Sequence, residues 1–193
     1  LLVLSFVSPM AGAGELLKLS EVLGPQFRLS LEAAEKLTEK AENLTWTGDY
    51  GEASQSLEEA LTLTEASLGS NHLDVANLLN SIAEIAIARG DPKRAAKLLD
   101  RSLDIGRKNY AETNVIFADA LKCQGMLKLV EGDLIESVTL CRRSLSIYEQ
   151  VCGKDHFAVG ACLQELGMVQ LQRAEHSDAL ESLERSRSII ERS

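Results

Sequence analysis

The chain has 193 residues, of which 45% are apolar, 25% are charged and only 4% are aromatic. This composition is typical of a folded protein, and the length suits one domain or one short repeat array. The abundance of Leu, Ala, Ser and Glu favours helices over a β-sandwich or barrel. The net charge of −9 argues against a role in binding the phosphate backbone of nucleic acids.

The first 14 residues have two interpretations. The apolar run over residues 1–7, the break at Pro9 and the small residues at 11–13 are typical of the end of a secretory signal peptide. The alternative is a frayed apolar helix at the end of a truncated repeat. A membrane span needs about 20 consecutive apolar residues, and no segment of the sequence is apolar for that long, so no membrane span is predicted.

The four cysteines, at positions 123, 141, 152 and 162, lie in apolar, helical contexts without CxxC or zinc-ligand spacing. We expect reduced core thiols, which favour a reducing compartment such as the cytoplasm. A signal peptide would instead indicate a secreted, lumenal or periplasmic protein. The sequence leaves the compartment open between these two.

A period of 42 residues runs through most of the chain. Small residues recur at Ala53, Ala95, Ser137 and Ala179, each shortly after a Gly-Asp or Ala-Glu pair. Leucines at 37, 79, 121 and 163 keep the same step, as do Ala or Gly at 41, 83, 125 and 167. The small residues predict helices that approach closely, because a bulky residue there would push them apart.

Each unit predicts two helices joined by a tight turn. In the second unit, apolar residues recur at helical spacing over 78–86, and Gly90 ends this first helix. Asp91 then suits the N-cap of the second helix. His72 and His156, two periods apart, are expected to cap or pack helices at the junctions between units.

These features resemble the tetratricopeptide repeat, in the 42-residue form found in kinesin light chains; the ordinary repeat has 34 residues. The most specific pieces are the junction over 68–76, the stretch over 78–83 and the Gly-Asp turns. The resemblance implies an all-α, right-handed α-solenoid of helix-turn-helix repeats. We expect a partial leading repeat at 15–33 and four repeats at 34–75, 76–117, 118–159 and 160–193.

In such arrays the first helix of each unit lines a concave groove, and the resemblance assigns four positions per helix to it. The candidate peptide-binding residues are Glu35, Thr38, Glu42, Asn77, Asn80, Glu84, Lys122, Met126, Gln164 and Met168. Asn80 matches an asparagine that bonds a peptide backbone in related repeats. Met126 and Met168 suit either a soft floor for a ligand or the filling of the core.

Charge indicates which ligand would suit this groove. Residues 34–75 carry nine acids and two bases, so a basic or mixed basic–apolar peptide would be drawn to the first unit. The bases between 89 and 108 lie mainly on the second helix of the second unit. We expect them to pair with acids of the first unit rather than to bind nucleic acid.

The resemblance implies a non-catalytic scaffold or adaptor with a protein or peptide partner. No phosphate-binding loop, dinucleotide turn, zinc-protease motif or hydrolase elbow occurs, so no catalytic residue, cofactor or metal is predicted. The alternative function is a structural spacer or self-association module, or an assembly factor if the chain is lumenal or periplasmic. Self-association would use the apolar residues of the C-terminal helix, Leu180, Leu183, Ile189 and Ile190.

Overall fold

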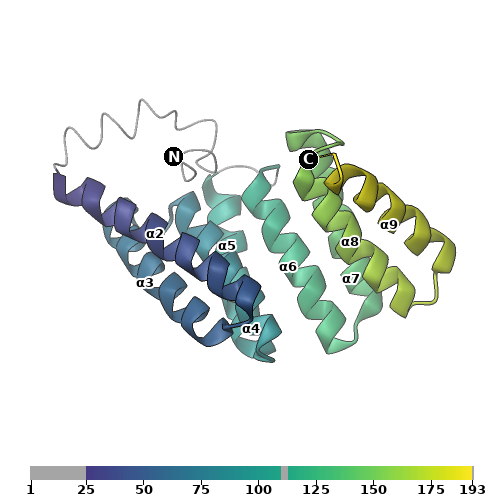
Figure 1. Cartoon of the computed structure of the whole chain (residues 1–193), viewed down its shortest axis with the longest axis horizontal. Coiled ribbons are helices and arrows are strands. Elements are labelled where there is room, and N and C mark those ends of the chain that lie inside the picture. Colours follow the sequence, from purple (N-terminus) through teal and green to yellow (C-terminus); the bar gives the residue numbers. More distant parts are fainter. Residues whose placement is uncertain (1–24, 110–112, 193) are drawn as a thin grey trace.

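The computed structural model describes residues 25–109 and 113–192. Residues 1–24 lie outside this description, and with them the signal-peptide interpretation and the start of the predicted leading repeat. The described helices are α2 (Pro25–Thr47), α3 (Tyr50–Leu68), α4 (Leu73–Ala88), α5 (Pro92–Asn109), α6 (Val115–Glu131), α7 (Leu134–Cys152), α8 (Phe157–Gln172) and α9 (His176–Ile190). They form four helical hairpins that stack in chain order (Figure 1).

Two rows of helices run along this stack. The first helices of the hairpins are α2, α4, α6 and α8, and α6 contacts both α4 and α8. The second helices α3, α5 and α7 each pack against their own first helix and against the first helix of the next hairpin. We call the exposed side of α2, α4, α6 and α8 the first-helix face. The predicted all-α repeat architecture is confirmed in the residues that the structure describes.

A glycine and an aspartate shape the turn inside each of the first three hairpins. Gly48, Gly90 and Gly132 have φ angles of 83°, 77° and 84°, in the left-handed region that glycine adopts without a steric penalty. The residues that follow them, Asp49, Asp91 and Asp133, each accept a backbone N–H, at 3.3, 3.1 and 3.1 Å. Each carboxylate therefore caps the second helix of its hairpin.

Ala174 occupies the glycine position in the fourth hairpin, with a φ angle of 59°. A Cβ in this region costs roughly 1–2 kcal/mol. We therefore expect Ala174→Gly to raise the free energy of unfolding by about 0.5–1 kcal/mol, after the extra chain entropy of glycine is subtracted. Urea denaturation measures this. The control Ala66→Gly, on the exposed side of α3, should lower it by a similar amount, and a loss in both variants would contradict the prediction.

Polar side chains begin the first helices at the junctions between hairpins. Nδ1 of His72 accepts the N–H of Asp74 at 3.2 Å, and Nδ1 of His156 accepts the N–H of Ala158 at 3.1 Å. The expectation that both histidines act at helix starts is confirmed. Asn114 takes the same register position at the middle junction and accepts a backbone N–H at 2.8 Å.

Small residues let the two helices of a hairpin touch. A Cβ on Gly125 of α6 would lie 2.7 Å from Sγ of Cys141 in α7. A Cβ on Gly167 of α8 would lie 2.6 Å from Cγ of Leu183 in α9. On the second helices, Ala53, Ala95, Ser137 and Ala179 are each 0% exposed. The predicted close approach is confirmed.

The first hairpin starts earlier than the repeat register predicts. Residues 25–33 were expected to belong to a leading repeat, but they form the opening turns of α2 and run without a break into 34–47. Ala34 and Ala41 then bury this helix in a cluster with Leu57 of α3. The register reports equivalent positions inside units, and it carries no information on how far the first helix extends beyond them.

Ion pairs join the second helices of the first two hairpins. Nη2 of Arg94 in α5 lies 2.6 Å from Oε1 of Glu58 in α3, and Arg101 pairs in the same way with Glu65. The hydrogen bond from Arg94 holds the pKa of Glu58 below its usual value. This confirms that bases of the second unit pair with acids of the first.

The positions of Glu58, Glu65, Arg94 and Arg101 recur every 42 residues along the second helices. We call this set of positions the second-helix ladder. At the junction of the last two hairpins, Arg185 pairs with Glu149 at 2.6 Å and Arg142 lies 4.0 Å from Asp178. At the middle junction the two facing pairs of ladder residues carry like charges. Asp100 of α5 faces Glu136 of α7, and Arg107 of α5 faces Arg143 of α7. Both of these arginines lie over the ring of Phe117, at 5.9 and 5.4 Å from its centroid.

Candidate ligand-binding surface on the first helices

The structure places all ten candidate residues on the row of first helices. Helix α2 carries Glu35, Thr38 and Glu42, α4 carries Asn77, Asn80 and Glu84, α6 carries Lys122 and Met126, and α8 carries Gln164 and Met168. Glu42, Gln164 and Met168 are exposed, Asn80 is buried and the other six are half-buried. The candidates therefore differ in how far a ligand could reach them.

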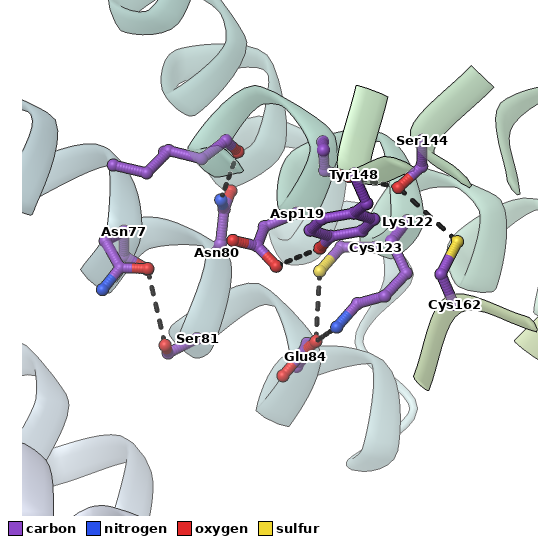
Figure 2. A network of polar contacts seen from close by, with 12 residues as sticks. Asn77, Asn80, Ser81, Glu84, Asp119, Lys122, Cys123, Ser144, Tyr148 and Cys162 are labelled. Carbon is purple, nitrogen blue, oxygen red and sulfur yellow. Dashed lines mark hydrogen bonds and ion pairs between the residues drawn. The ribbon is translucent and has the colours of Figure 1, made fainter. Parts of the chain in front are cut away.

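A polar cluster lies in the middle of this face, where α4 meets α6 (Figure 2). Nζ of Lys122 lies 3.1 Å from Oε1 of Glu84, and the thiol of Cys123 donates to the same oxygen at 3.3 Å. Beside them, the hydroxyl of Tyr148 in α7 donates to Oδ1 of Asp119 in α6. We call Glu84, Asp119, Lys122 and Tyr148 the central cluster, and its contacts tie α4, α6 and α7 together.

Burial and charge together set the ionisation of this cluster. Desolvation alone would lower the pKa of Lys122, but Glu84, Cys123 and Asp119 outweigh it and raise that pKa. Lys122 therefore stays charged. Desolvation raises the pKa of Asp119 and of Glu165, while the Lys122 charge lowers both. One base thus stabilises three carboxyl groups, counting Glu165 from α8.

Asn80 does not lie where a surface ligand could reach it. Its side chain is 3% exposed, and its amide nitrogen donates to the carbonyl oxygen of Ile116 at 3.1 Å. Its Oδ1 atom is buried without a hydrogen-bond partner. The amide therefore links α4 to the start of α6. Its burial places the Asn80 amide behind the exposed surface of the first-helix face.

The α2 end of the face is acidic, and one of its candidate side chains is hydrogen-bonded to the backbone of α2. The hydroxyl of Thr38 donates to the carbonyl oxygen of Ala34 at 2.9 Å. Glu42, one turn further on, is exposed. Trp46, near the end of α2, is 88% exposed and was not among the predicted site residues. This end therefore offers a carboxylate and a large aromatic surface.

The α6–α8 end of the face is apolar. Val130, Met168 and Leu171 are 58%, 41% and 47% exposed. Met126 is half-buried and packs against the buried cluster that contains Leu127. Of the two methionines, Met168 therefore offers the more accessible surface.

The remaining chemistry of the described residues is sparse. They contain no group of three or more His, Cys, Asp or Glu side chains that could hold a metal ion. Over the same ranges, no helix has the length and apolar character to cross a membrane. All four cysteines are free, and burial raises the pKa of Cys141 to about 12 and of Cys162 to about 11. These two thiols are therefore protonated and inert near neutral pH.

Stacked helical hairpins with a fixed 42-residue step define an α-solenoid repeat protein. The family model for the tetratricopeptide repeat matches residues 32–108 and 117–192, and the chain belongs to this family. Tetratricopeptide repeats generally mediate protein–protein interactions and are typically non-catalytic scaffolds.

Solved structures with the same fold include proteins related to kinesin light chains. BtubC (BKLC) from P. vanneervenii matches with a TM-score of 0.62 and 18% identity, over 81% of this chain and 62% of that chain. This chain therefore spans less than two-thirds of the BtubC structure. Two structures of nearly identical repeats from a putative kinesin light chain of Podosopora anserina match with TM-scores of 0.57 and 0.54, each at 21% identity. They cover 83% and 81% of this chain, and 77% and 74% of theirs. No curated protein matches the sequence.

Proposed function

We propose that the first-helix face binds an extended peptide of a partner protein. The ligand places basic side chains toward α2 and apolar side chains toward α8. The observation that carries this proposal is the change along the face, from exposed carboxylate on α2 to exposed aliphatic and thioether groups on α6 and α8. A ligand with the opposite order would bring its apolar groups to the acidic end.

Electrostatic attraction supports the basic part of the ligand. The first unit carries nine acids and two bases, and Glu42 is exposed within it. This surplus of acids gives the first hairpin a negative electrostatic field. Such a field speeds the association of a cationic peptide and weakens as ionic strength rises.

Exposed apolar surface supports the other part of the ligand. Val130, Met168 and Leu171 present apolar side chains on neighbouring first helices. Covering such surface contributes roughly 25 cal/mol for each Å² removed from water. The thioether of Met168 can also adapt its shape to different ligand side chains.

Binding of arrayed peptides to the full chain tests the proposal. We expect peptides with basic and apolar residues to be enriched, and the affinity of the best one is then measured by fluorescence anisotropy. Leu171→Ser and Glu42→Lys should each weaken that peptide by about tenfold, or ~1.4 kcal/mol. The matched controls Ile135→Ser on α7 and Glu59→Lys on α3 lie on second helices and should leave the affinity unchanged. Equal effects of face and control variants would contradict the proposed surface.

A structural or self-association role is the second candidate, and one observation favours it. Helix α9 leaves Leu180 59% exposed and Ile190 37% exposed, and an interface between two copies would remove this apolar surface from water. Sedimentation of the full chain over a range of concentrations tests self-association. A single monomeric species at high concentration would contradict it.

A further inference from the structure

The end of the stack formed by α8 and α9 contains a hollow of about 400 Å³. It is lined by Gln164 and Met168 of α8, by Leu183, Ser186, Arg187 and Ile190 of α9, and by Glu191, which follows α9. We call this surface, together with Leu180, the C-terminal face. Its apolar side chains are Met168, Leu180, Leu183 and Ile190.

The counterparts of these residues one unit earlier are covered by a helix. Tyr148 stands 42 residues before Ile190 and is 1% exposed, against 37% for Ile190. Val138 stands 42 residues before Leu180 and is 4% exposed, because it packs with Leu166 of α8. The residues of the C-terminal face therefore stand at repeat positions that, in the preceding hairpin, are covered by the first helix of the next one.

The second-helix ladder specifies the charge of what fits there. At the first junction, Glu58 and Glu65 receive arginines from the second helix of the next hairpin. Glu184 of α9 and Glu191, the residue directly after α9, occupy those two ladder positions. Both are exposed, and Glu191 lies 3.8 Å from Arg187 one turn earlier. The C-terminal face thus presents the same two acids, at the same spacing, that hold α5 against α3.

The described N-terminal end of the chain does not have the complementary chemistry. Where α4 buries Leu78, Ile82 and Ile85, α2 has the exposed residues Lys36, Lys40 and Asn43. Its ladder positions hold Glu52 and Glu59. A second copy stacked head to tail would bury two lysines and place acid against acid at both ladder positions, which is unfavourable.

We infer that the C-terminal face docks one kind of partner, a helical hairpin of this repeat type with a basic second helix. Its first helix fills the hollow with an apolar stripe like that of α4. Its second helix places Arg or Lys opposite Glu184 and Glu191, as α5 does opposite α3. Attraction at these two positions sets the register of docking, and repulsion excludes hairpins with acids there.

The chain itself supplies a probe of this chemistry. A second copy of residues 68–109, appended directly after Ser193, keeps the 42-residue step because Ser193 stands three periods after Ser67. This fusion holds the α4–α5 hairpin next to the C-terminal face. The control fusion carries Glu in place of Arg at the appended copies of Arg94 and Arg101. A third fusion combines that control with Glu184→Arg and Glu191→Arg.

We expect the first and third fusions to protect the appended hairpin from limited proteolysis, and to melt about 2–4 °C above the control fusion. Equal protection and equal Tm in all three would overturn the charge rule. Rapid proteolysis of the appended copy in all three would overturn docking itself. One set of results would show that the occupant is a second copy of the chain, and the inference would then be wrong. In that set the unfused chain forms a dimer, Ile190→Glu dissociates this dimer, and the fused hairpin does not prevent the dimer from forming.

Discussion

Replacing Gly125 with valine should lower the free energy of unfolding by about 2–3 kcal/mol, because the helices α6 and α7 touch at this residue. Even a Cβ there would lie 2.7 Å from Sγ of Cys141 and 3.4 Å from the carbonyl oxygen of Ser137. The Ser137 oxygen is already in van der Waals contact with that Cβ and belongs to the backbone, so the two γ carbons of valine fit only if the helices move apart. Urea denaturation followed by circular dichroism measures the loss.

Two further variants separate this clash from general effects on helices. Gly51→Ala in α3 meets only Oδ1 of Asp49, at 3.6 Å, and should stabilise the protein by up to about 1 kcal/mol through helix propensity. Adding Cys141→Ala to Gly125→Val removes the sulfur atom, so the double variant should lose less than the two single losses together. Additive losses, or a Gly125→Val protein as stable as the wild type, would contradict the packing argument.

Removing the charge of Lys122 should cost about 1–3 kcal/mol of unfolding free energy at neutral pH. Lys122→Met keeps much of the side-chain volume but leaves Glu84, Asp119 and Glu165 without their shared base. Loss of one partner of a fully buried ion pair costs about 3–5 kcal/mol. We expect less here because the Glu84 side chain is 41% exposed and water screens it. Chemical denaturation measures the loss.

The cost of Lys122→Met should depend on pH with a definite sign. Burial raises the pKa of Asp119 and Glu165 in the folded state, so the folded protein holds these protons more tightly than the unfolded chain. Stability therefore falls as pH rises through the interval between the ordinary and the raised pKa values. Without Lys122 those pKa values rise further. The difference between wild type and variant should be small below the ordinary carboxyl range and should grow toward neutral pH.

Lys128→Met on the same helix is the matched control. Lys128 pairs with Glu131 at 2.6 Å, but both side chains are more than a third exposed, and such pairs contribute about 0–1 kcal/mol. Lys128→Met should change the free energy of unfolding only slightly, and this change should vary little with pH. A Lys122→Met variant that behaves like Lys128→Met would show that the central cluster contributes little to stability.

The parts of the fold that follow from local sequence were predictable. The Gly-Asp turns, the histidine caps and the small residues at 125 and 167 all act on neighbours within one unit, so a constant period is enough to find them. The extent of α2 was not predictable in this way. It depends on residues 25–33, which precede the first full copy of the pattern and have no counterpart with which to compare them.

The candidate surface was predictable only to the level of which helices form it. Four fixed positions per helix selected Asn80, whose contact with Ile116 depends on how two units stack. The same rule passed over Glu165, which follows Gln164 and comes under the influence of Lys122 only because α8 packs beside α6. Relations between units depend on their mutual rotation, and no single-residue pattern encodes that rotation.

The charges of the second-helix ladder make the array mechanically uneven. Bending that separates the second helices must pull Arg94 from Glu58 at the first junction and Arg185 from Glu149 at the last. At the middle junction the same motion moves like charges apart, while Lys122 and Glu84 hold the opposite side closed. The ion pairs of the ladder therefore oppose bending at the two outer junctions, and at the middle junction they do not.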